Sequence, residues 1–232
     1  MSAFGLILAM ALSAGPDELT VVSYNIRGGR TGDGEVQLGP LRGAIDQSGA
    51  QLMALQEVDR GALRSGKVDQ ARHLAGARNY VFGTSLTFPD GGEYGNAVFT
   101  EHPQLWACTH RLSKSSEPRT ALEVVVAVDD IPISFVSTHF ENADGPEVRQ
   151  LQAESLIAVL RERPWPVIVA GDLNALRGEA AILAFDRFFG KQKPVGATFP
   201  ADAPRLEIDF IYQNVGDAQM QGALRDAAFQ AK

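Results

Sequence analysis

Residue types that bind metal ions or phosphate stand at the ends of several apolar, strand-like stretches of the sequence. They are Asn25 after "VVSY", Glu57 after "LMALQ", His139 after "ISFVST", and Asp172 and Asn174 in "VIVAGDLN". Strand ends in α/β sheets open onto a common rim, where ligand sites tend to lie. One polar residue after a strand is more often a cap or turn residue. Four such ends with these side chains together predict a functional site at the rim.

The side chains at this rim are rich in oxygen donors, with one imidazole and no thiol. Carboxylate and amide oxygens suit a hard ion such as Mg²⁺ or Mn²⁺ better than a structural zinc ion. Such an ion offsets charge on a phosphate oxygen, and the neutral donors Asn25, Asn174 and His139 suit the transition state of phosphate-ester hydrolysis. The residues therefore predict Mg²⁺- or Mn²⁺-dependent chemistry on a phosphate ester.

The composition is that of a folded domain of ordinary size. Of the 232 residues, 45% are apolar and 21% are charged, which allows a sizeable core. The formal net charge of −7 counts against a protein that binds nucleic acid mainly through its phosphates. The single cysteine, Cys108, excludes an intrachain disulfide and lies in the strand-like "QLWACTHRL", where a buried thiol is expected.

The N-terminal segment has an apolar run from Ala3 to Leu12, followed by small residues. This run has the length of a signal-peptide core and is too short for a membrane span, so residues 1–15 are predicted to be a signal peptide. No Lys or Arg precedes the run, and a buried N-terminal strand or short helix is the alternative. The expected location is secreted or periplasmic, with the cytoplasm as the alternative, and no other stretch suits a bilayer.

Strand-like and helix-like stretches alternate from Leu19 onward without a long linker, which predicts a single domain over residues 19–232. β-branched apolar patterns predict strands at 19–26, 51–58, 94–100, 122–129, 131–140, 166–173 and 206–212. Helices are expected at 146–163 and, shorter, at 40–49 and 69–78. A hairpin around Asp129 and Asp130 favours mixed over purely parallel pairing.

In combination these motifs resemble the endonuclease/exonuclease/phosphatase superfamily, which includes pancreatic-type DNases, apurinic endonucleases and neutral sphingomyelinases. The likeness runs from about Leu19 to Tyr212 and rests on "VVSYNIRGG", "LMALQEVD", "YGNAVFT", "STHFEN", "VIVAGDLNA" and "TFPADAPRLEIDFIY" in this order. "GDLN" and "IDFIY" after "TFP" are specific together, whereas "THF" or "YGN" alone is not. The resemblance implies a four-layer α/β sandwich, with two mixed β-sheets face to face and helices outside.

The resemblance also implies roles for individual residues. Glu57 would be the principal Mg²⁺ ligand, with Asn25 beside it. Asp172 would position or deprotonate the attacking water, and Asn174 would donate to a phosphate oxygen. His139 would stabilise the phosphate or protonate the leaving oxygen. Substrate contacts are expected for Tyr94, Asn96 and Arg119, although an exposed strand arginine is an equal alternative for the last.

Asp209 lies within the apolar stretch 206–212, where a carboxylate needs a cation or a hydrogen-bond donor. The resemblance implies that Asp209 orients a histidine in a later Ser-Asp-His triplet, yet none of the four histidines follows it. Three explanations stay open: the chain is truncated before the triplet, another group such as His110 or Asp226 substitutes, or catalysis is weakened. The final strand of the family is expected to be missing, which would expose a sheet edge.

The expected function is therefore divalent-metal-dependent hydrolysis of a phosphodiester by direct attack of water. The expected substrate is nucleic acid or a phospholipid or small phosphodiester, and no specific protein partner is predicted. The alternative is a catalytically weakened or inactive relative that binds metal and phosphate.

Overall fold

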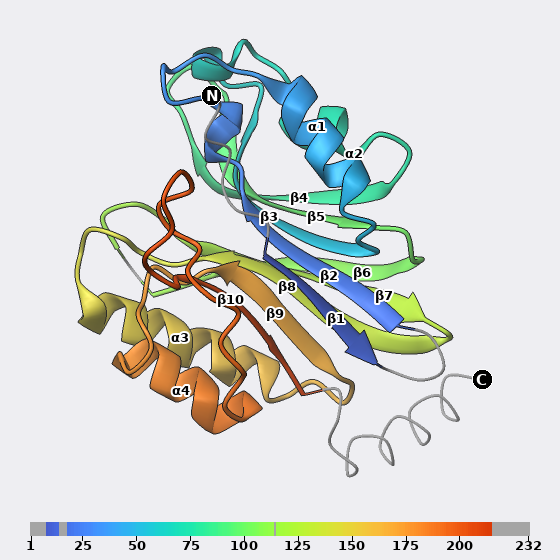
Figure 1. The fold of residues 1–232 in the computed structure, drawn as a ribbon, viewed down its shortest axis with the longest axis vertical. Coiled ribbons are helices and arrows are strands. Elements are labelled where there is room, and N and C mark those ends of the chain that lie inside the picture. The colour runs from blue at the N-terminus through green and yellow to red at the C-terminus, as the bar shows by residue number, and fades with distance from the viewer. Residues whose placement is uncertain (1–7, 14–17, 114, 215–232) are drawn as a thin grey trace.

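The computed structural model describes residues 8–13, 18–113 and 115–214 of the chain. Within these ranges ten strands form two five-stranded sheets that lie face to face, and helices cover the outer faces (Figure 1). This is the four-layer α/β sandwich with two mixed sheets that the resemblance implies, and that prediction is confirmed.

The first sheet has the strand order β1-β2-β3-β5-β4. Only β2 and β3 run parallel, and the other neighbours are antiparallel. Helices α1 and α2 pack on the outer face of this sheet (Figure 1). The elements are β1 (Leu8–Ser13), β2 (Glu18–Asn25), β3 (Leu52–Arg60), β4 (Asn79–Thr87), β5 (Glu93–Thr100), α1 (Leu38–Gln47) and α2 (Gln70–Ala75). Short 3₁₀ turns follow β2 and β3, namely η1 (Arg27–Gly29) and η2 (Leu63–Ser65).

The second sheet has the strand order β10-β9-β8-β7-β6, with β8 and β9 as its parallel pair. Strands β7 and β8 form the predicted hairpin, whose turn residues Asp129 and Asp130 have the positive φ angles of 49° and 64° that tight hairpin turns favour. Helices α3 and α4 cover the outer face. The elements are β6 (Gln104–Arg111), β7 (Thr120–Val128), β8 (Ile131–His139), β9 (Val167–Asp172), β10 (Asp209–Gln213), α3 (Pro146–Leu160) and α4 (Ala180–Phe189).

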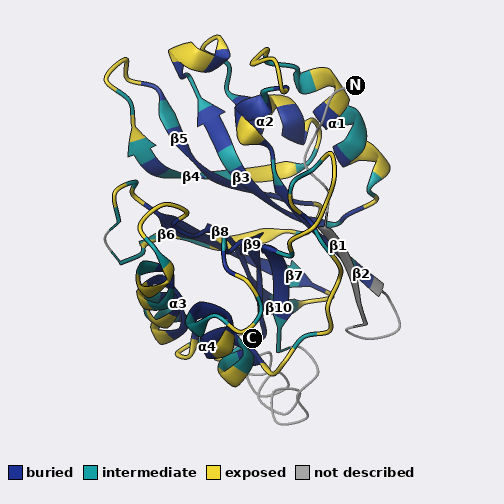
Figure 2. Ribbon diagram, turned by 60° about the vertical axis from the view of Figure 1, so that its left-hand side comes forward, coloured by how far each residue is buried: buried dark blue, intermediate teal, exposed yellow. Residues whose placement is uncertain are grey.

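Three apolar layers hold the four structural layers together. The central layer lies between the sheets and includes Leu52, Val124 and Ile211. One outer layer joins the first sheet to α1 and α2, and the other joins the second sheet to α3 and α4. Dark blue, buried strands accordingly run through the middle of the molecule, whereas the exposed residues lie on helices, connections and the edge strands β4 and β6 (Figure 2). The inner strands β3, β5, β7, β8 and β9 are buried on both faces, which explains their nearly continuous apolar runs.

Two predictions from the sequence, the start of the last strand and the burial of Cys108, differ from the structure. Strand β10 begins at Asp209, so Leu206 lies outside it and is 42% exposed. Cys108 is half-buried, because β6 is an edge strand. The expected absence of a final strand and the substitute Asp226 fall on residues outside the described ranges.

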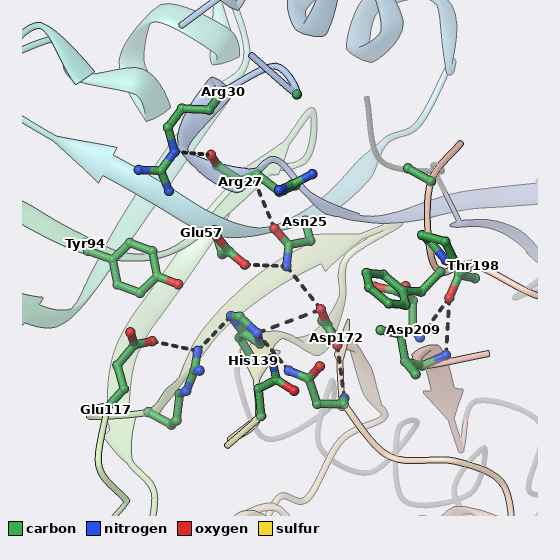
Figure 3. A pocket seen from close by; sticks show the side chains of 18 of the residues that line it. Asn25, Arg27, Arg30, Glu57, Tyr94, Glu117, His139, Asp172, Thr198 and Asp209 are labelled. Carbon is green, nitrogen blue, oxygen red and sulfur yellow. Dashed lines mark hydrogen bonds and ion pairs between the residues drawn. The ribbon is translucent and has the colours of Figure 1, made fainter. Parts of the chain in front are cut away.

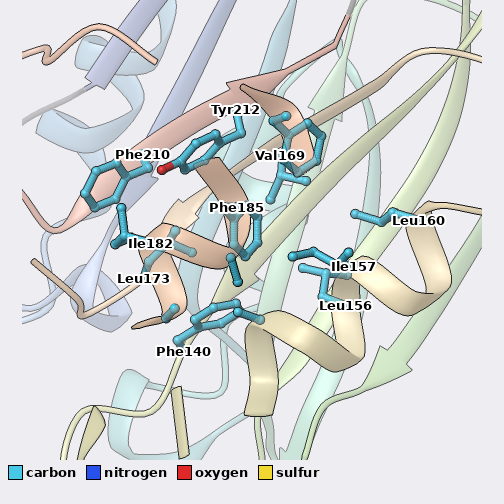
Figure 4. Packing of buried hydrophobic residues seen from close by; sticks show 14 of the residues in the cluster. Phe140, Leu156, Ile157, Leu160, Val169, Leu173, Ile182, Phe185, Phe210 and Tyr212 are labelled. Carbon is cyan, nitrogen blue, oxygen red and sulfur yellow. The ribbon is translucent and has the colours of Figure 1, made fainter. Parts of the chain in front are cut away.

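Aromatic packing dominates the layer beneath α3 and α4 (Figure 4). The ring of Phe185 lies 6.0 Å from that of Phe140, 5.6 Å from that of Phe189 and 5.1 Å from that of Tyr212, centroid to centroid. Phe185→Ala is expected to lower the free energy of unfolding by about 3–5 kcal/mol, because it removes a fully buried ring and leaves a cavity.

Denaturant unfolding monitored by circular dichroism measures this loss. Leu183→Ala is the matched control on the same helix, because Leu183 is 43% exposed and its truncation should cost less than about 1 kcal/mol. Equal losses of unfolding free energy in the two variants would show that Phe185 does not dominate the stability of this apolar layer.

Candidate active site

Polar residues from both sheets meet at one cavity of about 630 Å³ (Figure 3). Asn25 is the last residue of β2, His139 the last of β8 and Asp172 the last of β9, while Asp209 is the first of β10. The sheet register pairs Asp172 with His139 on one side and with Asp209 on the other. Glu57 reaches the same cavity from β3. The structure thus brings together the residues that the strand-end pattern predicts.

Local backbone geometry aims two of these side chains into the cavity. The pairing of β3 with β5 shifts between Leu55 and Val58, and Glu57 in this bulge has a φ of 55°. Asn174, just after β9, has a φ of 46°. Left-handed conformations in non-glycine residues cost free energy and occur preferentially at functional sites. Bulges likewise redirect a side chain next to active sites.

The Asn25 amide links carboxylates from the two sheets. Its Nδ2 donates to Glu57 Oε1 at 2.9 Å and to Asp172 Oδ2 at 3.1 Å. The backbone N–H of Arg27 donates to Asn25 Oδ1 at 3.0 Å, which fixes the orientation of the amide. Asp172 Oδ1 accepts a further hydrogen bond from the backbone N–H of Asn174 at 3.0 Å. The site is therefore organised by its own hydrogen bonds.

His139 has nitrogen donors on both sides of its ring. Arg119 Nη1 lies 3.0 Å from Nδ1, and because a guanidinium only donates, Nδ1 accepts. Nε2 then carries the proton of the neutral ring and faces Asp172 Oδ2 at 3.8 Å. Its 3.0 Å contact with Asn174 Nδ2 joins two donors and is not a hydrogen bond in this tautomer. Burial lowers the pKa of His139 well below its usual range, and the positive charge of Arg119 lowers it further. His139 is thus a neutral donor facing the cavity.

Arg119 is buried, so the alternative of an exposed strand arginine is wrong. It precedes β7 and lines the cavity. Its Nη1 lies 2.9 Å from Glu117 Oε1, and its Nε lies 3.6 Å from Glu141 Oε2. These two carboxylates hold the guanidinium against His139, which makes it part of the site.

The carboxylates of the cavity repel one another. Burial and the neighbouring Asp209 and Glu57 raise the pKa of Asp172 to about 8, although hydrogen bonds from Asn25 and Asn174 oppose the shift. Burial also raises the pKa of Asp209 to about 6, against the effect of a hydrogen bond with Thr198. Neither these two aspartates nor Glu57 forms an ion pair with Lys or Arg within the described ranges. A cation would relieve this repulsion.

The donor set fits a hard divalent ion. Among the described residues, no group of three or more His, Cys, Asp or Glu side chains is arranged as a complete metal site. Mg²⁺ needs no such group, because it commonly takes one or two protein carboxylates and fills its other positions with water and phosphate. Glu57 supplies a carboxylate to the cavity. The neighbouring Asn25 orients this carboxylate through Nδ2, while its Oδ1 accepts from the Arg27 N–H.

Tyr94 lines the cavity as expected, and burial raises its pKa, so the phenol stays protonated. Asn96 is not among the lining residues: its buried amide donates to the backbone carbonyl of Thr120 at 2.9 Å. It therefore supports the cavity wall from behind. His110 does not line the cavity either, since its Nε2 bonds Glu123 Oε2 at 2.7 Å.

Several lining residues have no counterpart in the sequence-based predictions. These are Arg27, Arg30, Arg64, Phe88, Glu117, Asn142, Thr198 and Phe199. Most come from connections rather than strands, so no periodic pattern marks them. The sequence offers one indication of these residues: the "IRGGR" segment around η1 places two arginines shortly after Asn25, at the end of its strand.

The raised pKa of Asp209 predicts a pH-dependent stability for the metal-free protein. Its folded-state pKa of about 6 lies above the ordinary value of 3.8, so its stabilising contribution is complete below the ordinary value and is lost as the pH rises through about 6. Asp209→Asn cannot ionise, so the melting temperature of the variant minus that of the wild type should increase between about pH 4 and pH 7.

Thermal unfolding in EDTA measures this difference across the pH range. Asp130→Asn, in the β7–β8 turn, is the control for loss of one negative charge. Parallel melting curves for the wild type and Asp209→Asn at every pH would contradict the assigned shift.

The two face-to-face mixed sheets, with a cavity of carboxylates and amides at their strand ends, place the protein in the class of four-layer α/β sandwiches. The model of the Endonuclease/Exonuclease/phosphatase family matches residues 22–219, and the chain belongs to this family. Its members are in general metal-dependent phosphoesterases.

Solved structures with the same fold share little sequence with the chain. An endonuclease/exonuclease/phosphatase from Bacteroides vulgatus is 18% identical, with a TM-score of 0.66, and the match covers 83% of this chain and 85% of that one. The human Nocturnin catalytic domain with bound sulfate anion is 18% identical, with a TM-score of 0.63 and coverages of 90% and 86%. A protein of the same description from Beutenbergia cavernae is 21% identical, with a TM-score of 0.59 and coverages of 71% and 51%, so the chain spans about half of it. No curated protein matches the chain.

Proposed function

We propose that the protein is a divalent-metal-dependent phosphodiesterase that hydrolyses its substrate by direct attack of water. The observation that carries this proposal is the convergence of Asn25, Glu57, Asp172, Asn174 and His139 at the strand ends, where hydrogen bonds link the first four and His139 faces Asp172. Family membership supports the same reaction class.

Each residue has a role that its position supports. Glu57 would hold a Mg²⁺ or Mn²⁺ ion, which when bound offsets charge on a phosphate oxygen, and Asn25 beside it would orient the carboxylate and the metal's water. Asp172, whose pKa is raised in the metal-free site, accepts a proton from water and orients it. His139 and Asn174 donate hydrogen bonds to phosphate oxygens. Because His139 is neutral and donates through Nε2, we assign it to phosphate stabilisation rather than to protonation of the leaving oxygen.

A second candidate is a catalytically weakened relative that binds metal and phosphate. In the described part of the chain, no histidine bonds to Asp209, and the Thr198 hydroxyl accepts from its backbone N–H at 3.3 Å. Calorimetry that detects Mn²⁺ binding in a protein without turnover would favour this candidate.

Hydrolysis of matched chromogenic esters tests the proposed reaction. The proposal predicts that bis(4-nitrophenyl) phosphate is cleaved with Mg²⁺ or Mn²⁺ and that EDTA stops the reaction. It also predicts a higher kcat/KM for this diester than for 4-nitrophenyl phosphate. Preference for the monoester would instead assign a phosphatase.

The location of the protein stays a prediction, and we propose export. Residues Leu8–Ser13 of the predicted signal peptide form β1 and pair with β2 in the structure. None of the helices in the described part of the chain has the length and hydropathy of a bilayer span. N-terminal sequencing of the native protein distinguishes cleavage near residues 14–16 from retention of β1.

A further inference from the structure

One wall of the cavity carries positive charge that its carboxylates do not neutralise. The segments after β2 and β3 contribute Arg27, Arg30 and Arg64 to this wall. Figure 3 shows Arg27 and Arg30 beyond Asn25 and Glu57, on the side away from His139. The chain as a whole has a net charge of −7, so a wall with three arginines differs in sign from the protein's overall charge.

Arg64 is held rigidly but keeps one edge free. Its Nε donates to Asp59 Oδ2 at 2.9 Å and its Nη2 to Asp59 Oδ1 at 2.6 Å. The guanidinium also lies over the rings of Phe88 and Tyr94, at 4.5 and 5.1 Å from their centroids. Its Nη1 forms no hydrogen bond with any described residue, so this edge is available to a ligand.

Arg30 approaches the same place without a carboxylate partner. Its Nε donates to the Arg27 carbonyl at 3.2 Å, and it forms no ion pair within the described ranges. A Cβ atom on Gly28 would lie 3.3 Å from Asp59 Oδ2 and 3.7 Å from Arg30 Cζ. Glycine at this position, with a φ of 65°, therefore leaves room for Arg30 and the Asp59–Arg64 pair to lie close together. At this place, the guanidinium groups of Arg30 and Arg64 lie near one carboxylate, that of Asp59.

We propose that Arg30 and Arg64 form a subsite for a second phosphate group of the substrate. This inference rests on the proposed function, which places the scissile phosphate at Glu57 and Asp172. Guanidinium groups match the geometry of phosphate oxygens and keep their charge in a partly buried site. The subsite favours a diester that carries another phosphate, as in a nucleic acid strand or a phosphorylated polyol. A choline headgroup would instead place a cation against the arginines.

A matched pair of substrates isolates the second phosphate. Thymidine 5′-(4-nitrophenyl phosphate) and its 3′-phosphorylated form share the scissile bond and differ only in that group. The wild type is expected to show a kcat/KM ratio of roughly 10–100 in favour of the 3′-phosphorylated compound, the size of one or more charge-assisted hydrogen bonds.

Two variants and one control assign this preference to the arginines. Arg30→Gln removes a charge without exposing a carboxylate partner, and Asp59→Asn/Arg64→Gln removes a buried ion pair together, so that no unpaired buried charge remains. Both are expected to bring the ratio toward 1. Arg72→Gln, on the exposed face of α2, removes a charge outside the cavity and should keep the wild-type ratio.

A ratio near 1 in the wild type, or equal ratios in Arg30→Gln and Arg72→Gln, would overturn the subsite. If neither compound is hydrolysed, the proposed function fails, and calorimetry with thymidine 3′,5′-bisphosphate then tests the subsite alone. Binding at least about 10-fold weaker in both arginine variants supports it, and equal affinity overturns it. An inositol bisphosphate in parallel distinguishes a polyol from a nucleoside as the source of the second phosphate.

Discussion

Replacing Asp172 with asparagine is expected to lower kcat on a phosphodiester by roughly 100- to 10,000-fold, the usual contribution of a positioned acid–base group. The Asp172 carboxylate is suited to accept a proton from water, because burial, Asp209 and Glu57 raise its pKa to about 8. An asparagine side chain accepts no proton at that position. Its amide would also meet Asn25 Nδ2, which donates to Asp172 Oδ2 in the wild type.

The Asp172 prediction is tested by steady-state kinetics at saturating metal. Asp130→Asn serves as the matched control because Asp130 directly precedes β8, whose other end carries His139. Its asparagine tolerates the positive φ of the turn. A circular-dichroism spectrum and melting temperature close to those of the wild type would exclude misfolding. Less than about a 10-fold loss in kcat would remove Asp172 from the chemistry.

The second large effect is expected for Glu57→Gln. This change keeps the shape of the side chain and its capacity to accept from Asn25 Nδ2 but removes the charge that a divalent ion requires. The metal concentration for half-maximal activity should rise at least about 10-fold, because even outer partners of a metal site contribute that much. Maximal activity should also fall.

A Mn²⁺ titration of activity, supported by calorimetry of Mn²⁺ binding, measures the Glu57 effect. Glu162→Gln, an exposed residue just after α3, is the control for loss of one carboxylate. If Glu57→Gln titrates like the wild type, the metal lies elsewhere and the assignment of Glu57 is wrong.

The sequence was sufficient to predict which strand ends converge. Asn25, His139 and Asp172 each follow a β-branched run, and the register of the second sheet then places His139 beside Asp172. Asp209 is unusual in the sequence because it interrupts an apolar stretch. Its neighbour in the structure, Asp172, depends on β10 pairing with β9, which no local pattern specifies.

Elements with weaker patterns were not predicted. Strand β4 lies at the edge of its sheet, and six of its nine residues are buried or half-buried without a clear apolar–polar alternation in the sequence. Helix α4 is a short run in which apolar residues are nearly continuous, so its period is hard to distinguish from that of a strand. Neither of them supplies a residue of the carboxylate cluster.

The remaining differences concern the walls of the cavity. Arg119 is buried because the charges of Glu117 and Glu141 pair with its guanidinium, a tertiary arrangement without a sequence signature. Asn96 faces away from the cavity because it bonds the Thr120 carbonyl on the neighbouring sheet. Arg64 reaches the cavity only because Asp59 and two aromatic rings fix its direction. Such walls are set by tertiary contacts rather than by spacing.

The release of 4-nitrophenol from bis(4-nitrophenyl) phosphate by the purified protein tests the central claim most directly. The wild type with Mn²⁺ is compared with the same sample after EDTA and with Asp172→Asn under identical conditions. The account predicts turnover that EDTA abolishes, that added Mn²⁺ restores and that Asp172→Asn lacks. Turnover that persists in EDTA or in Asp172→Asn would contradict a metal-dependent reaction at this site.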